Sequence, residues 1–335
     1  MIRGRWVRRE SGHPEDCISS VMGCPIEVRS VVYVSRLVRT VRAVSRELRR
    51  PTVLPQKRLT LGVAFGGGFA RGISHIGVLK VLQEEGIPVD YVAGTSVGAI
   101  IGAGYCSGMT AAELKDVACA VRLRDFGRLT LSRYGFYNSD RMVRLFARVL
   151  KCHTFEDLKI PLAIVATEFR TGEAVVFTKG ALADPIRASC AYPGMFLPVE
   201  IDRRSYIDGM LAYGVPTTPL RKMGAECVIG SHLSAHLNGI RPPRHIFEVI
   251  GQCFSIAQSK LSDSWLRDAD LVIEPNVVGF SYDCFERTPE LIAAGEATMR
   301  AKLPELRALL NAPRVGSTPK PGIASVVTPT TSPAG

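Results

Sequence analysis

Ser96 lies in the pentapeptide Gly94-Thr95-Ser96-Val97-Gly98, and this serine between two glycines is the strongest chemical signal in the chain. An apolar run over 89–93 precedes it, and small apolar residues over 97–101 follow it. A strand that turns sharply into a helix around such a serine is typical of a nucleophile elbow. We expect Gly94 and Gly98 to let strand and helix approach closely, with the serine hydroxyl projecting from a turn at a helix N-terminus.

A second candidate site is a run of glycines. Gly66, Gly67 and Gly68 follow a buried strand predicted over 59–65, and Arg71 lies three residues further on. Consecutive glycines can turn their backbone N–H groups toward an anion. The spacing fits neither the dinucleotide pattern G-x-G-x-x-G nor a Walker loop, because no GK[ST] follows. The segment therefore indicates an oxyanion or phosphate site, or a tight turn that only joins strand to helix.

A carboxylate suited to act as a base stands far downstream. Asp208 ends a pair of short strands predicted over 199–207, and Gly209 follows it. An aspartate before a glycine turn usually serves the turn itself. A catalytic role requires Asp208 to lie beside Ser96 in space.

Taken together, these motifs resemble the patatin-like phospholipase family in both order and spacing. The resemblance covers roughly residues 59–233. It rests on the glycine loop G-G-G-x-A-R-G, H-I-G-V-L-K over 75–80, G-T-S-V-G-A around Ser96, A-x-P-G-x-F-x-P-V over 191–199, and I-D-G at 207–209.

The resemblance implies a three-layer α/β/α sandwich with a mainly parallel central sheet, in which a serine–aspartate dyad hydrolyses lipid or other acyl esters without a histidine. It places Ser96 as the nucleophile and Asp208 as the base. It also places the loop of Gly66, Gly67, Gly68 and Arg71 at the oxyanion, and it implies no metal and no cofactor.

The chain departs from the family pattern at two positions near the expected site. Phe69 stands where many members have a further glycine, and Met210 replaces the small residue expected after Asp208-Gly209. Both side chains are expected to crowd the acyl pocket, which affects substrate size more than catalysis.

The expected chemistry places one condition on Asp208. A free aspartate has a pKa of about 3.9 and is a poor base toward an alcohol, so burial must raise its pKa. Under that condition we expect an acyl-serine intermediate, which is hydrolysed by water that Asp208 activates.

Two other functions fit the sequence. A Ser-His-Asp esterase or acyltransferase needs a histidine after the acid, and His232, His236 and His245 are available. His75 lies in the helix after the glycine loop, and we interpret it as structural. A non-catalytic lipid- or nucleotide-binding module on the same fold is the other alternative.

The basic charge is concentrated at the ends of the chain. The formal net charge is +11, and residues 1–58 hold thirteen Lys or Arg against five Asp or Glu. The nearly neutral remainder disfavours a nucleic-acid-binding core. Within the basic extension, 31–50 has the pattern of a cationic amphipathic helix, which suits peripheral contact with an anionic membrane or packing on its own domain. We expect a catalytic domain over 59–311 and a disordered tail over 312–335.

Cysteine usage and hydropathy bear on the compartment. Nine cysteines lie far apart with no C-x-x-C, which indicates reduced thiols in a cytoplasmic setting. We expect neither a secretory signal nor a membrane span. Nothing in the sequence indicates an oligomeric state.

Overall fold

The structure is a computed structural model that describes residues 58–233 and 246–311. Residues 1–57, with the helix expected over 31–50, lie outside the described residues, as do His236, His245 and the tail over 312–335. The predictions for those segments stay predictions.

The centre of the described part is an eight-stranded sheet, and five of its strands are mutually parallel. A parallel sheet needs cover on both faces, so its strands are apolar almost throughout. The parallel strands are, in spatial order, β11 (Leu271–Ile273), β10 (Cys227–Ser231), β1 (Leu61–Phe65), β2 (Tyr91–Thr95) and β5 (Leu162–Glu168). Beyond them, β9 (Arg204–Asp208) and β6 (Ala174–Phe177) each pair antiparallel with β5, and β8 (Val199–Ile201) pairs antiparallel with β9.

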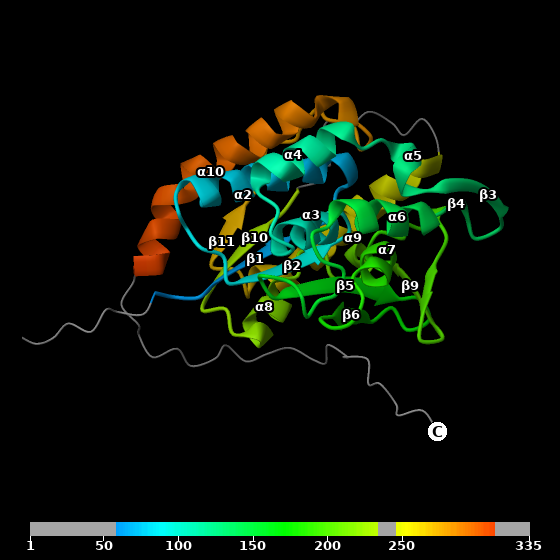
Figure 1. Cartoon of the computed structure of the whole chain (residues 1–335), viewed down its shortest axis with the longest axis horizontal. Helices are drawn as coiled ribbons and strands as arrows, with labels where there is room; N and C mark the ends of the chain where they lie inside the picture. Colours follow the sequence, from blue (N-terminus) through cyan, green and yellow to red (C-terminus); the bar gives the residue numbers. More distant parts are fainter. Residues whose placement is uncertain (1–57, 234–245, 312–335) are drawn as a thin grey trace, which may run out of the picture. The chain divides into compact units, whose positions relative to one another are not determined.

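Helices cover both faces of this sheet. Along β1, Leu61, Val63 and Phe65 enter the larger core cluster and Ala64 enters a second one on the opposite face. The first face carries α2 (Ser74–Glu84), α3 (Val97–Cys106), α4 (Ala111–Ala120) and α10 (Thr288–Asn311), and the second carries α8 (Thr217–Met223) with the end of α9 (Ile246–Leu266). Figure 1 shows α10, α2 and α4 on one side of the strands and α8 on the other. The predicted three-layer α/β/α sandwich is thus confirmed.

A small second sheet lies beside the sandwich, and the sequence did not predict it. A hairpin of β3 (Arg128–Ser132) and β4 (Gly135–Asn138) is extended by β7 (Gly194–Phe196), which runs parallel to β4. In the chain, α5 (Leu123–Phe126) precedes this hairpin and α6 (Asp140–Val149) follows it. α6 packs on α5 and on α7 (Ala183–Ser189), which itself lies against β5, β8 and β9 of the main sheet. Three short 3₁₀ turns complete the described residues: η1 (Phe69–Ile73), η2 (Gly209–Leu211) and η3 (Phe285–Arg287).

None of the helices in residues 58–233 and 246–311 combines the length and the apolar character that crossing a bilayer requires.

Candidate active site

Ser96 occupies the sharp turn between β2 and α3. Its φ of +56° and ψ of −124° place a non-glycine residue in a sparsely populated region, a conformation that costs on the order of 1–3 kcal/mol. The flanking glycines are needed because backbone atoms approach them. A Cβ on Gly94 would lie 2.4 Å from the Gly98 carbonyl oxygen, and one on Gly98 would lie 2.2 Å from that of Phe65.

The sheet register brings Asp208 to this turn from far along the chain. β5 lies between β2 and β9, with Thr95 opposite Val165 and Asp208 opposite Ala166. Because Val165 and Ala166 are adjacent in β5, the end of β9 lies next to the serine turn at the end of β2. The Ser96 hydroxyl donates to Asp208 Oδ2 at 2.8 Å, and these side chains belong to residues only 6% and 1% exposed.

Asp208 is held both at its carboxylate and at its backbone carbonyl. The backbone N–H of Met210 donates to Oδ1 at 2.9 Å, while Thr167 Oγ1 donates to the Asp208 carbonyl at 2.8 Å. Gly209 is required here because a Cβ would lie 2.2 Å from the Val165 carbonyl oxygen. Burial raises the pKa of Asp208 to about 7, against the opposing effect of the hydrogen bonds from Met210 and Ser96. This carboxyl is a much better proton acceptor than a free aspartate.

The glycine loop lies directly against the serine. A Cβ on Gly67 would lie 3.2 Å from Ser96 Cβ. The N–H of Gly66 is already used, because it donates to the Ser231 carbonyl at 3.0 Å as the loop leaves the sheet. Within the described part of the chain, the N–H groups of Gly67 and Gly68 have no acceptor. These two amides are available to a negative charge beside Ser96.

Phe69 follows this loop and is itself in the left-handed region, with a φ of +53°. A glycine adopts that conformation without strain, which suits the glycine that is common at this position in the family that the sequence resembles. Phe69 is held by aromatic packing instead, with its ring centroid 4.8 Å from that of Tyr192 and 6.5 Å from that of Tyr282.

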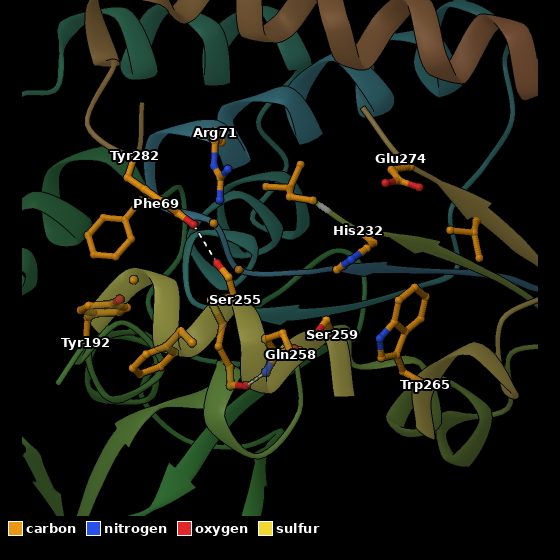
Figure 2. A pocket seen from close by; sticks show the side chains of 18 of the residues that line it. Phe69, Arg71, Tyr192, His232, Ser255, Gln258, Ser259, Trp265, Glu274 and Tyr282 are labelled. Atoms are coloured by element: carbon orange, nitrogen blue, oxygen red, sulfur yellow. Dashed lines mark hydrogen bonds between the residues drawn. The ribbon is translucent and has the colours of Figure 1, made fainter. Parts of the chain in front are cut away.

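A pocket of about 310 Å³ opens beside the glycine loop. In Figure 2, Phe69, Tyr192 and Tyr282 line one end of it and His232 and Trp265 the other, while Ser255, Gln258 and Ser259 come from α9. Ser96 and Asp208 do not line it. Met210 and Gly67 do, and a Cβ on Gly67 would lie 2.2 Å from Met210 Sδ. The Met210 side chain therefore lies against the loop at the boundary between the pocket and the dyad.

Arg71 brings a cation to this pocket from η1. Its guanidinium carbon lies 3.8 Å from the centroid of the Tyr282 ring, a cation–π contact, and its Nε is buried without a hydrogen-bond partner. Among the described residues no carboxylate forms an ion pair with Arg71, and Figure 2 shows the side chain directed into the pocket. An unneutralised guanidinium in a half-buried position favours an anionic ligand group.

The described histidines do not contact the dyad. His75 is fully buried, with Nε2 3.0 Å from the Gly66 carbonyl oxygen and Nδ1 2.9 Å from Ser231 Oγ. Burial lowers its pKa to about 4, so it is neutral; since a carbonyl only accepts, Nε2 carries the proton. His75 thus fixes the glycine loop, in agreement with its structural interpretation. His232 lines the pocket against Trp265, and burial lowers its pKa as well.

Two contacts at the site were not foreseen from the sequence. The backbone N–H of Ser96 donates to Ser189 Oγ at 2.8 Å, and that hydroxyl donates to the Val165 carbonyl at 2.6 Å. Ser189 thereby ties the serine turn to β5. Tyr282, which stacks on Arg71, comes from a loop near the C-terminal helix with no motif around it.

Residues 63–221 match the family model described as patatin-like phospholipase, and this match contains the glycine loop, Ser96 and Asp208. The chain carries a patatin-like phospholipase domain. An uncharacterised NTE family protein of Mycobacterium tuberculosis is 32% identical over 177 residues, which are 52% of this chain and 49% of that protein. Patatin-like phospholipase domain-containing protein 6 of Homo sapiens is 34% identical over 183 residues, which are 51% of this chain and 13% of that protein. Lysophospholipase NTE1 of Mycosarcoma maydis is 30% identical over 182 residues, which are 51% of this chain and 9% of that protein.

The chain thus spans at most about half the length of these curated relatives. The shared regions are 177–183 residues long, so the similarity covers about half of this chain and does not extend to the remainder of either protein.

The position of Met210 leads to a test on the patatin-like domain. We expect Met210→Ala to widen the passage between the pocket and Ser96, and to raise kcat/KM for long-chain p-nitrophenyl esters about tenfold relative to short-chain ones. The Met210 N–H that holds Asp208 is unchanged by this substitution. Met210→Leu serves as the control of similar volume, and an equal effect on all chain lengths would show that Met210 does not limit access.

Proposed function

We propose that the patatin-like domain hydrolyses carboxylic ester bonds of phospholipids or lysophospholipids through an acyl-serine intermediate. The observation that carries this proposal is the 2.8 Å hydrogen bond between the buried Ser96 hydroxyl and the buried Asp208 carboxylate, at a strained turn. The name of the Mycosarcoma maydis relative, a lysophospholipase, supports the substrate class.

In the first half-reaction, Ser96 Oγ attacks the ester carbonyl carbon and its proton passes to Asp208 Oδ2. The carbonyl oxygen becomes an oxyanion, which accepts hydrogen bonds from the N–H groups of Gly67 and Gly68. One such donor is typically worth roughly 3–4 kcal/mol in the transition state. When the tetrahedral intermediate collapses, the C–O bond to the alcohol breaks and the alcohol leaves with the proton from Asp208.

In the second half-reaction, a water molecule gives a proton to Asp208 and its oxygen attacks the acyl carbon. The same amides hold the new oxyanion. The bond from carbon to Ser96 Oγ then breaks, the fatty acid leaves, and the proton returns from Asp208 to the serine. Asp208 ends each cycle unprotonated.

The pH dependence of this cycle follows from the environment of Asp208. Only the unprotonated carboxyl can accept the serine proton, and burial raises the pKa of Asp208 to about 7. We expect kcat/KM for a soluble short-chain ester to rise about tenfold per pH unit below 7 and to level off above it. A profile measured between pH 5 and 9 tests this, and a rate that is constant across pH 5–8 would contradict it.

Arg71 is proposed to bind the phosphate of the lipid. A charge-assisted hydrogen bond is worth roughly 1.5–3 kcal/mol, so we expect Arg71→Gln to raise KM for a lysophospholipid about 10- to 100-fold. Activity on an uncharged p-nitrophenyl ester should change little, because that substrate has no phosphate. Arg71→Lys, which keeps the charge, should lie in between. An equal loss of activity on both substrates would show that Arg71 supports the glycine loop and does not bind the phosphate.

The ester panel that tests the proposed function compares wild type with Ser96→Ala on p-nitrophenyl esters, phospholipids and lysophospholipids. We expect release of fatty acid by the wild type alone. A folded wild type that binds these lipids but hydrolyses none would favour the non-catalytic module.

A further inference from the structure

The β3–β4 hairpin and the start of α6 expose large apolar side chains to solvent. Leu129, Tyr134, Phe136 and Val143 are 67%, 60%, 50% and 36% exposed. They form part of what we call the arginine–aromatic surface, residues 122–148. Single apolar residues on a surface are ordinary, but four within fifteen positions on one projecting hairpin and the adjoining helix indicate a contact surface.

The same surface is strongly basic. It holds seven arginines and two acidic residues, and every one of the arginines is exposed: Arg122, Arg124, Arg128, Arg133, Arg141, Arg144 and Arg148. Both acids are already engaged, since Asp125 accepts from the backbone N–H of Arg122 at 2.9 Å and Asp140 pairs with Arg187 at 2.8 Å. In the described residues none of the seven arginines forms an ion pair, so their charge is open to an anionic partner.

Charged and apolar groups alternate here at close range. The Arg133 guanidinium lies 5.0 Å from the centroid of the Tyr134 ring, with Arg128 directly before Leu129. A long cationic side chain next to an apolar or aromatic one suits the boundary of a bilayer, where the ring enters the head-group region and the guanidinium reaches a phosphate. Figure 1 shows β3 and β4 projecting from the body of the domain, which suits insertion better than a groove would.

The arginine–aromatic surface adjoins the wall of the active-site pocket. β4 pairs with β7, and the ring centroid of Tyr137 lies 6.1 Å from that of Phe196. β7 begins two residues after Tyr192, which lines the pocket. A Cβ on Gly194 would lie 2.8 Å from Ile250 in α9, and α9 also contributes pocket residues. A lipid surface at the hairpin would therefore be separated from the pocket by one short strand.

We infer that the arginine–aromatic surface docks the patatin-like domain onto bilayers that contain anionic phospholipids, with Leu129 and Tyr134 entering the head-group region. This inference stands on exposure and charge and does not depend on catalysis at Ser96. It is also separate from the contact predicted for residues 31–50.

The first experiment measures co-sedimentation of the full chain with vesicles of phosphatidylcholine, with and without 30% phosphatidylglycerol. Each arginine near an anionic surface contributes about fivefold in partition, so Arg128→Gln with Arg133→Gln should weaken binding to the anionic vesicles about 25-fold. Leu129→Ser with Tyr134→Ser should weaken it by tenfold or more. Phe169→Ser with Arg170→Gln is the matched control, an exposed aromatic–arginine pair in the turn after β5, and should bind as wild type does.

A second measurement reports on the hairpin itself and excludes a contribution from the N-terminal extension. The fluorescence of Tyr134→Trp should be quenched by brominated lipid in anionic vesicles, while that of Phe169→Trp should not. Ser96→Ala should bind vesicles normally, and the hairpin variants should still hydrolyse a soluble short-chain ester if the proposed function holds. Unchanged vesicle binding by both double variants, or fluorescence of Tyr134→Trp that brominated lipid leaves unquenched, would overturn the inference.

Discussion

Ser96→Ala is expected to lower kcat/KM for every ester by at least about 10⁴-fold, because in the proposed mechanism this residue supplies the attacking oxygen and alanine has no hydroxyl to replace it. The measurement is fatty acid or p-nitrophenol release with purified, folded protein. Ser107→Ala is the matched control, since Ser107 is another buried serine at the end of the same helix. Its hydroxyl donates to the Gly104 carbonyl at 2.7 Å and accepts from the Lys151 N–H at 3.3 Å, away from Ser96 and Asp208. It should keep near wild-type activity.

The backbone of Ser96 allows a check on the same residue that does not depend on catalysis. Because Ser96 has a φ of +56°, the variant with glycine there should be more stable than the variant with alanine by about 1 kcal/mol, although we expect both to be inactive. Chemical denaturation of Ser96→Gly and Ser96→Ala compares the two. An equal or lower stability of the glycine variant would show that the turn is not strained, and appreciable activity in either variant would remove Ser96 as the nucleophile.

Asp208→Asn is expected to abolish hydrolysis to a similar degree and, at the same time, to stabilise the fold at neutral and alkaline pH. An amide cannot accept the serine proton, which accounts for the loss of activity. The stability effect arises because the pKa of the buried carboxyl is about 7, well above the value in an unfolded chain. Between those two pKa values the folded state binds the proton more strongly, so the stability of the wild type falls as the pH rises through that range.

The asparagine variant has no such titration. Its gain in unfolding free energy over the wild type is therefore absent below about pH 4 and grows to a few kcal/mol, on the order of 4 at most, by pH 8. Urea denaturation at pH 4 and at pH 8 measures it. Asp202→Asn is the control, because Asp202 is an exposed acid in the turn before the same strand. An Asp208→Asn variant with the same stability difference at both pH values would show that this carboxyl is not desolvated.

The parts of the site that sequence analysis anticipated are those fixed by local backbone chemistry. Gly94, Gly98 and Gly209 were expected at tight turns, and each one faces a backbone carbonyl oxygen that leaves no room for a side chain. The strand, turn and helix around Ser96 follow from the same local pattern. The three-layer sandwich also follows from alternating buried strands and helices, since a parallel sheet must be covered on both faces.

The parts that local patterns alone do not predict depend on partners distant in the chain. The contact of Ser96 with Asp208 is predicted only by the family resemblance, because it follows from the position of β5 between β2 and β9, which no periodicity reveals. The stacking of Tyr282 on Arg71 and the support of Ser96 by Ser189 likewise join segments that carry no shared pattern. The sequence does not predict the β3–β4 hairpin, because its exposed apolar residues do not show the pattern of a core strand.

Labelling with a fluorophosphonate, followed by mass spectrometry of the digested chain, tests the proposed catalytic dyad of Ser96 and Asp208 most directly. The reagent adds to a serine only when its hydroxyl is activated by a neighbouring base and its oxyanion is stabilised. The dyad predicts a single adduct on the peptide that contains Ser96, formed at least about 100-fold more slowly in Asp208→Asn. Labelling of Ser96 at the same rate in both proteins, or an ester-hydrolysing chain whose adduct lies on another residue, would contradict it.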